Sequence, residues 1–345
     1  MTLFNGVFPT SRRRVLQLLG LLGLGGSELV RAATALAEAG ERAAHVWPEM
    51  TYRTLGRTGF SGSRLVFGCG AALMFWGKDE LLNEAFEHGV NVFDVGTSDY
   101  YRNAEANLAG FAKKRRDRIF LISKGLVGFD IAPGDELTGA QRKTAARNWS
   151  TALDKSLSDL QTDHLDAYYV MAVNNVSLVR SAEMHDAFVT AKQAGKVDHW
   201  GVSTHQNAQA VLDAMTATGW YSLVQIAITP AGWYDWTAKS ILPDSKPMAA
   251  LRPTLDRARE AGIGLIGMKA GRHLAGRWLG FGPDRPAAFD THYEAAFLKA
   301  PLSPFQRSYA YVLAHGLDAV NADSQSIEHL RENFIAAATA QSYFA

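Results

Sequence analysis

The sequence predicts an α/β fold, a single closed (β/α)₈ barrel of the TIM type. About eight short apolar stretches alternate with helical patterns after residue 50, and this alternation is typical of a parallel sheet. The alternation fills residues 50–345, a usual length for one such barrel. No Gly-x-Gly-x-x-Gly pattern follows the first stretch, which counts against an open dinucleotide-binding sheet.

Each element has its own local signal. Strands are expected at short apolar runs, and helices at longer stretches with apolar residues three or four positions apart. In chain order, the expected strands are 64–70, 90–94, 118–124, 164–173, 199–203, 222–228, 263–269 and 317–322. The expected helices are 78–89, 104–116, 138–160, 182–195, 207–219, 248–262, 303–316 and 326–341. Capping boxes open two of these helices, at Thr138 with Gln141 and at Ser303 with Gln306. Pro253 marks either the true start of its helix or a kink.

Two connections are longer than the others, residues 125–137 and residues 229–247. Long loops in a compact domain are usually functional. The aromatic residues Trp233, Tyr234 and Trp236 of the second loop either line a ligand cleft or pack the loop onto the barrel. Trp233 is therefore a candidate substrate contact.

The overall composition excludes several classes of protein. The formal net charge of +1 gives no basis for bulk electrostatic binding of nucleic acid. The single cysteine, Cys69, excludes an intrachain disulfide and a thiol-rich metal site. Beyond the N-terminus no apolar run reaches the ~20 residues that span a bilayer, so no stable membrane span is expected.

The N-terminal segment differs from the rest of the chain. Three arginines, Arg12 to Arg14, precede the apolar run 15–24, and small residues with Ala-x-Ala sites follow. This layout is typical of a secretory signal, and the paired arginines resemble the twin-arginine export signal. We expect residues 1–39 to be removed by cleavage, with the protein periplasmic or secreted through the twin-arginine machinery. The alternative is a basic amphipathic helix that stays attached.

Polar side chains gather where the expected strands end. In a barrel of this kind the active site lies at the C-terminal ends of the strands, so residues far apart in sequence meet around one rim. The residues at these ends are Asp94, Lys124, Met171, Asn174, Asn175, Ser203, Thr204, His205, Gln225, Met268 and Lys269.

Several of these motifs, in this order, resemble the aldo-keto reductases. The resemblance extends from "TYRTLGRTGFSGSRLVFG" at residue 51 to "SIEHLRENFIAAA" near the end, and includes "FDVGTSDYYRNAE", "GVSTH" and "GIGLIGMKAG". In that family an Asp ends the second strand, a Tyr follows in a Tyr-Gly-x-x-Glu loop, and a Lys ends the third strand. The resemblance implies that Asp94, Tyr101 and Lys124 are catalytic. Tyr101 has the family's spacing to Glu105, but the loop is about two residues longer than usual, so Tyr100 competes with it.

The resemblance also implies the reaction. A hydride moves between a nicotinamide cofactor and a carbonyl or alcohol, and Tyr101 acts as the general acid. An ammonium next to a phenol lowers its pKa, so Lys124 is expected to lower the pKa of Tyr101 while Asp94 orients Lys124. Proton transfer of this kind contributes about 10²- to 10⁴-fold in rate.

The cofactor residues also follow from the resemblance. Ser203, Thr204 and Gln225 match segments that hold the nicotinamide amide, Met268 and Lys269 a segment that covers the ring. Arg272 is a candidate for the pyrophosphate. The family's Lys-Ser and Arg that grip a 2′-phosphate are not evident: Asp323 and His329 fall near those positions, while Ser324 and Asn333 remain candidates. An acidic residue there suits a ribose hydroxyl, so the choice between NAD and NADP stays open.

One departure from the family affects the expected activity. Met171 stands where the family has the fourth-strand His, and a thioether cannot donate a hydrogen bond to a carbonyl oxygen. Met171 is expected as an apolar wall of the substrate site. His205 either donates in place of the missing His or faces solvent. A non-catalytic barrel that acts as a binding or scaffold protein is therefore the alternative. A metal-dependent hydrolase or isomerase ranks last, because only Asp94 and His205 qualify as ligands, and no metal is expected.

Overall fold

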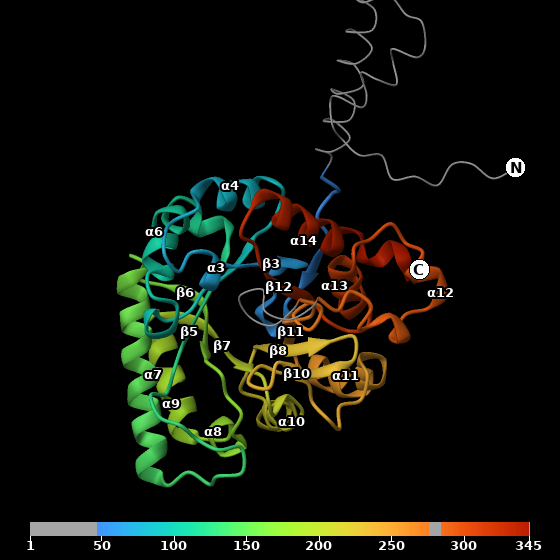
Figure 1. The fold of residues 1–345 in the computed structure, drawn as a ribbon. Helices are drawn as coiled ribbons and strands as arrows, with labels where there is room; N and C mark the ends of the chain where they lie inside the picture. The colour runs from blue at the N-terminus through green and yellow to red at the C-terminus, as the bar shows by residue number, and fades with distance from the viewer. Residues whose placement is uncertain (1–46, 276–283, 345) are drawn as a thin grey trace, which may run out of the picture. The chain divides into compact units, whose positions relative to one another are not determined.

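A closed ring of eight parallel strands forms the centre of the computed structural model (Figure 1). The structure describes residues 47–275 and 284–344, and Pro48–Ala345 form one compact unit. The strands, in order around the ring, are β3 (Leu65–Gly68), β4 (Val92–Asp94), β5 (Phe120–Gly125), β6 (Leu165–Val170), β7 (Val197–Thr204), β8 (Leu223–Thr229), β11 (Gly264–Met268) and β12 (Ala319–Asp323). Pairing of β12 with β3 closes the ring, which confirms the predicted (β/α)₈ barrel. The expected signal, residues 1–39, lies outside the described residues.

Side chains fill the interior of the barrel. The buried cluster there consists of Leu55, Val66, Val92, Phe120, Ile122, Ala167, Tyr169, Leu223, Ile266 and Ala319. Leu55 comes from the connection between β1 (Tyr52–Thr54) and β2 (Ser61–Ser63), an antiparallel pair, and Phe60 packs against the same cluster. The hairpin therefore closes the end of the barrel where the strands begin. Ligands are expected at the opposite end, where the strands finish.

A helix follows each barrel strand and packs on the outside of the ring (Figure 1). These helices are α4 (Asp79–Glu87), α6 (Ala104–Arg115), α7 (Gly139–Asp159), α9 (Ala182–Gln193), α10 (Ala208–Thr218), α11 (Arg252–Glu260), α13 (Pro304–Ala314) and α14 (Ile327–Thr339). The described part of the chain also forms four shorter helices, α3 (Cys69–Ala72), α5 (Ser98–Tyr101), α8 (Val176–Val179) and α12 (Ala295–Leu298). Both predicted capping boxes are present.

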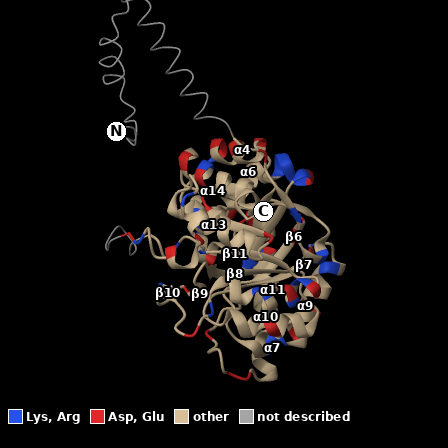
Figure 2. Ribbon diagram, turned by 90° about the vertical axis from the view of Figure 1, so that its right-hand side faces the viewer, with Lys and Arg blue, Asp and Glu red and all other residues tan. Residues whose placement is uncertain are grey.

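The charges lie mainly on the surrounding helices and loops, with both signs mixed, while the barrel strands are largely uncharged (Figure 2). Among the described residues, no helix combines the length and the apolar character needed to cross a bilayer. The apolar interior therefore stabilises the barrel. The charged side chains lie at its surface and at the ends of the strands.

Several expected elements differ from the structure in their bounds or type. The first strand ends at Gly68, and Cys69 begins α3. The helix expected from residue 248 begins as α11 at Arg252, after a 3₁₀ turn, because Pro253 fits the first helical turn. The expected loop 229–247 contains an antiparallel hairpin, β9 (Gly232–Asp235) and β10 (Ser240–Ile241), which extends from β8. Gly232 allows this tight return because its φ is 108°.

Candidate functional site

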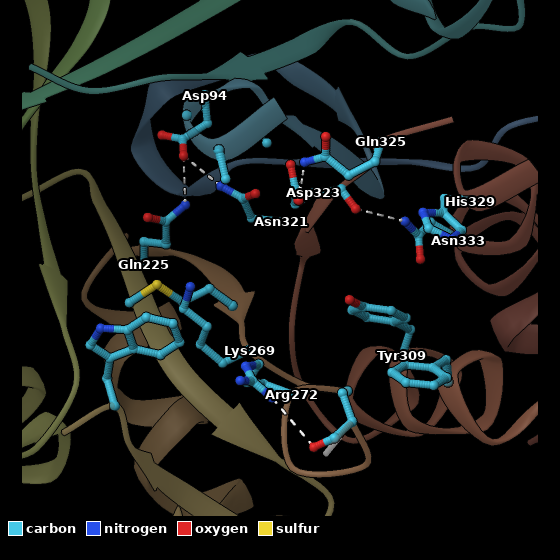
Figure 3. Close-up of a pocket in the computed structure, with 18 of the residues that line it drawn as sticks. Asp94, Gln225, Lys269, Arg272, Tyr309, Asn321, Asp323, Gln325, His329 and Asn333 are labelled. Atoms are coloured by element: carbon cyan, nitrogen blue, oxygen red, sulfur yellow. Dashed lines mark hydrogen bonds between the residues drawn. The ribbon is translucent and has the colours of Figure 1, made fainter. Parts of the chain in front are cut away.

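One cavity of about 540 Å³ opens at the C-terminal ends of the strands (Figure 3). At one side lie Asp94 and Gln225, and at the other lie Tyr309, His329 and Asn333. The remaining lining includes Tyr101, Lys124, Trp236, Met268, Lys269, Arg272, Phe305, Asn321, Asp323, Gln325 and Glu332. The cavity is therefore elongated, and five of the eleven residues predicted at the strand ends line it: Asp94, Lys124, Gln225, Met268 and Lys269.

Asp94, at the end of β4, is buried and accepts from three side chains on three other strands. Lys124 Nζ lies 2.5 Å from its Oδ1. Gln225 Nε2 and Asn321 Nδ2 donate to its Oδ2 at 3.1 and 2.5 Å. One cation and two amide donors thus satisfy the oxygens of this buried carboxylate, which lowers the cost of burying it. Sequence reasoning missed Asn321, although it is a polar residue in the last predicted strand.

Two glycines hold the ring of Tyr101 in the cavity wall. A Cβ at Gly70 would lie 2.7 Å from Tyr101 Cε1, and a Cβ at Gly96 would lie 3.1 Å from its Cδ2. The same Cβ at Gly96 would lie 2.9 Å from Lys124 Cγ, so the phenol ring and the lysine stem meet at this glycine. Tyr100 is 47% exposed and does not line the cavity. Tyr101 is therefore the phenol next to the Asp94–Lys124 pair.

The environment of Tyr101 shifts its acidity in the direction opposite to the sequence prediction. Burial, together with Asp94 and Tyr100, raises the pKa of the Tyr101 phenol above its ordinary value. Burial is the largest cause of this shift, and the Asp94 carboxylate, 2.5 Å from the Lys124 ammonium, acts on the phenol in the same direction. Tyr101 therefore stays protonated at neutral pH, the state required of a proton donor.

A basic wall follows β11. Lys269 and Arg272 line the cavity beside Met268, and Arg272 Nη1 donates to the Ala275 carbonyl at 3.4 Å. Burial lowers the pKa of Lys269 to about 8, and the neighbouring Lys239 and Arg272 act in the same direction. Positive groups held in a low-dielectric wall are suited to a negatively charged ligand.

The far side of the cavity is formed by the end of β12 and the start of α14. Gln325 Nε2 donates to Asp323 Oδ2 at 2.6 Å, and Asn333 Nδ2 donates to the buried Ser324 Oγ at 3.1 Å. Ser326 caps α14 by accepting from the His329 N–H at 3.3 Å. Burial raises the pKa of Asp323. Asn333 thus lines the cavity directly, whereas Ser324 lies behind it.

Three predicted site residues are engaged outside the cavity lining. Ser203 Oγ accepts from the Ala172 N–H at 3.0 Å, and Thr204 Oγ1 donates to Asn174 Oδ1 at 3.4 Å. Met171 is buried, and its N–H donates to the Gly125 carbonyl. The two hydroxyls therefore fasten the segment after β6 to the end of β7.

The predicted substrate contacts in the β7 and β8 loops, His205 and Trp233, are not among the residues that line the cavity. Trp233 is buried in β9 and its N–H donates to Ser245 Oγ at 2.7 Å; Trp236, three residues later, lines the cavity. The His205 ring lies 6.4 Å from the Trp236 ring. Burial, with Lys269, lowers the pKa of His205 to about 3, so its imidazole is neutral and half-buried instead of solvent-facing.

Sequence reasoning missed the residues of α13 that line the cavity. Phe305 and Tyr309 are one helical turn apart and both line the cavity. In the sequence, this spacing indicates only the buried face of a helix. Among the described residues, no group of three or more His, Cys, Asp or Glu side chains could hold a metal ion.

Comparisons with known proteins agree with the barrel fold. The sequence pattern of the Aldo/keto reductase family matches residues 76–243, just under half of the 345 residues. The structure is similar to an aldo-keto reductase from Bacillus halodurans in its holo form, with a TM-score of 0.59 and 20% identity over 83% of this chain and 90% of that chain. It is also similar to an aldo-keto reductase from Klebsiella pneumoniae in complex with NADPH, with a TM-score of 0.58 and 19% identity over 84% and 89% of the two chains. The chain therefore has the (β/α)₈ barrel fold of the aldo-keto reductases, and its residues 76–243 carry that family's sequence pattern.

Proposed function

We propose that this chain is an oxidoreductase of the aldo/keto reductase family that moves a hydride between a nicotinamide cofactor and a carbonyl or alcohol. The observation that carries the proposal is the convergence of Asp94, Tyr101 and Lys124 at one end of the 540 Å³ cavity. The family match at residues 76–243 supports it.

The cavity fits a dinucleotide in size and in the order of its polar groups. Its volume lies within the ~300–1,000 Å³ of ligand pockets. Gln225 would hold the nicotinamide amide, Lys269 and Arg272 the diphosphate, and Asn333 the adenosine (Figure 3). Ser203 and Thr204 remain candidates for the amide only if their present bonds to the segment after β6 are exchanged. A cofactor bound there supplies or accepts the hydride.

The side chains of the protein handle the proton. In reduction a C–H bond forms at the carbonyl carbon, the C=O π bond opens, and the Tyr101 hydroxyl gives its proton to the carbonyl oxygen. Tyr101 then recovers a proton from solvent. The raised pKa of Tyr101 does not prevent this step, because an alkoxide is a much stronger base than a phenolate. Lys124, fixed by Asp94, stabilises the oxygen as its charge develops.

The cofactor we propose is NAD(H) in preference to NADP(H). Asp323 and Glu332 line the far side of the cavity, and a carboxylate there repels a 2′-phosphate but accepts from a ribose hydroxyl. Lys78, which donates to the Gln325 carbonyl at 2.9 Å, and Lys269 both act on Asp323 and would offset part of that repulsion. The preference is thus expected to be moderate.

The test combines cofactor binding with turnover. NADH and NADPH are titrated by tryptophan fluorescence, and aldehydes and ketones are then assayed for oxidation of the bound cofactor. We expect micromolar binding, and a fall in turnover of about 10²- to 10⁴-fold in Tyr101→Phe with cofactor affinity unchanged. Tyr100→Phe is the matched control and keeps its activity, since Tyr100 does not line the cavity. Absence of binding for both cofactors would overturn the proposal.

A second candidate is a cofactor-binding barrel without turnover. Met171 stands at the end of β6, so no imidazole from that strand donates to a substrate oxygen, and Met171 itself does not line the cavity. In this case the wild-type protein binds the cofactor but reduces none of the carbonyl probes, and Tyr101→Phe behaves like the wild type.

We also propose that the protein is exported through the twin-arginine machinery, from the arginines at positions 12–14 and the apolar run after them. Replacement of Arg12 and Arg13 by lysine should retain the protein in the cytoplasm. Export unaffected by the double substitution would defeat this proposal.

A further inference from the structure

A hydrogen bond from the last strand of the barrel reaches the carboxylate at the proposed reaction centre. Asn321 lies in β12, and its Nδ2 donates to Asp94 Oδ2 at 2.5 Å (Figure 3). The two residues are not on neighbouring strands, because β3 pairs with β12 on one side and with β4 on the other. The Asn321 side chain therefore crosses β3 to reach Asp94.

Gly68, the last residue of β3, leaves the space for this crossing. It is the residue of β3 that pairs directly with Asp94 in β4. A Cβ at Gly68 would lie 2.5 Å from Asn321 Oδ1, too close for the carboxamide to keep its place. The close approach of the Asn321 side chain to the backbone thus depends on a glycine at position 68, and it ends on the carboxylate of Asp94.

The two carboxamides that share Asp94 Oδ2 are not equivalent. Gln225 Nε2, from β8, donates at 3.1 Å, whereas Asn321 Nδ2 donates at 2.5 Å, and both residues line the cavity. In the proposed function Gln225 also holds the nicotinamide amide, so its carboxamide has two partners. Within the described residues, the hydrogen bond of the Asn321 side chain goes to Asp94. Asn321 is therefore the donor that stays on Asp94 whether or not a cofactor is bound.

A donor on Oδ2 also decides which oxygen Lys124 meets. Lys124 Nζ lies 2.5 Å from Asp94 Oδ1. Rotation about the Cβ–Cγ bond of an aspartate is soft, so a carboxylate without a partner on Oδ2 would turn and carry the ammonium with it. With Asn321 on Oδ2, the direction of the Lys124 ammonium is fixed in advance, as stabilisation of a developing charge requires.

We propose that Asn321 is a positioning residue for the reaction. It fixes the Asp94 carboxylate, and through Asp94 the Lys124 ammonium, while Gln225 is engaged with the cofactor. This inference rests on the proposed oxidoreductase function. Asn321 acts through Asp94 and handles neither the proton nor the hydride.

The test compares Asn321→Leu with Gln225→Leu, using the aldehyde that the wild type reduces fastest. Leucine has the branched shape of asparagine without the donor. In Asn321→Leu, kcat at saturating NADH should fall about 10- to 100-fold, the size of effect that a small misplacement of a catalytic group has. Its affinity for NADH, measured by tryptophan fluorescence, should stay within about twofold of the wild type. Gln225→Leu should show the reverse, with weaker NADH binding and kcat within about threefold.

The matched control repeats the substitution where its target is absent. In an Asp94→Asn background, the added Asn321→Leu should change kcat by no more than about twofold, because two residues that act through one contact are not additive. Denaturant unfolding shows whether each variant is folded. Should Asn321→Leu not fold, Asn321→Ser, whose side chain is too short to reach Asp94, carries the same expectations.

Three results would overturn the role of Asn321. A kcat equal to that of the wild type would show that Asp94 needs no donor from β12. A loss of NADH affinity as large as in Gln225→Leu would make Asn321 a cofactor contact. An equal loss of kcat with and without the Asp94 carboxylate would make the effect independent of Asp94. Failure of the oxidoreductase function is distinct, because it shows in the wild type alone, which then oxidises no bound NADH, and it removes this inference as well.

Discussion

Two buried carboxylates lie at opposite ends of the barrel and differ in the groups that donate hydrogen bonds to them. Asp94 ends β4 and accepts only from side chains, Lys124, Gln225 and Asn321. Asp318 directly precedes β12, and its Oδ2 accepts from the backbone N–H of Leu265 at 2.8 Å. Both are nearly inaccessible to solvent.

The cations near Asp318 contact its carboxylate and backbone carbonyl groups. Arg259 Nε lies 3.4 Å from Asp318 Oδ1, and the neighbouring buried Arg64 donates to the carbonyls of Leu313 and Leu317 at 2.7 and 3.0 Å. These cations join β3 to the segment before β12. The charges at this end therefore bind the chain to itself, whereas those around Asp94 face a cavity. In such a barrel, polar groups at the end where the strands begin serve stability, and those at the opposite end serve chemistry.

The sharpest way to break this comparison is a matched pair of substitutions, Asp94→Asn and Asp318→Asn. In Asp94→Asn turnover should fall by about 10²- to 10³-fold, since Lys124 loses the group that orients it. In Asp318→Asn the free energy of unfolding should fall by about 1–3 kcal/mol, with turnover per folded molecule unchanged. Denaturant unfolding and steady-state rates measure both. Equal loss of activity in the two variants would mean that the ends are not separable.

A second substitution sharpens the role of packing at the cavity end. Gly96→Ala places a methyl group 2.9 Å from Lys124 Cγ and 3.1 Å from Tyr101 Cδ2, so both side chains must move. We expect turnover to fall by up to about 10²-fold and the free energy of unfolding by about 1–3 kcal/mol. The control is Gly110→Ala on the exposed face of α6, where nothing lies within 4 Å; it should stabilise the helix by about 0.5–1 kcal/mol. Full activity in Gly96→Ala would show that the alignment of Tyr101 with Lys124 is not required.

The smallest expected effect is a dependence of cofactor binding on pH. Burial lowers the pKa of Lys269 to about 8, so its ammonium is charged below that pH and loses its charge as the pH rises through it. If Lys269 holds the cofactor diphosphate, as proposed, the affinity for NADH should be level below about pH 8 and fall above it. Lys269→Gln should bind NADH more weakly and without that fall. An affinity of the wild type that stays level through about pH 8 would contradict the role of Lys269 at the diphosphate.

Much of the fold followed from the sequence because the signals were local. The alternation of apolar runs with helical patterns predicted all eight barrel strands, and both capping boxes began helices where expected. The hairpin β9–β10 was missed because its strands have only four and two residues, too few to show a period of two.

The site was less predictable, because it depends on distances between segments. The spacing to Glu105 favoured Tyr101 over Tyr100, but no spacing displays the contacts with Gly70 and Gly96 that hold the Tyr101 ring. The prediction of a lowered pKa for Tyr101 differs from the structure for the same reason: the sequence pairs Lys124 with the phenol but cannot show that the phenol is buried and that Asp94 also acts on it. Asn321 became recognisable only when β12 met β3 and closed the ring.

The plug at the start of the barrel also bears on the order of ligand exchange. Leu55 and its hairpin fill the end where the strands begin, so the cavity above Asp94 is closed on that side. Ligands therefore reach Asp94 from the end where the strands finish. A dinucleotide lying along the whole cavity would narrow that entrance, so the smaller reactant binds after it and departs before it. The kinetic consequence would be an ordered mechanism, in which the dinucleotide exchanges only after the smaller reactant has left the cavity.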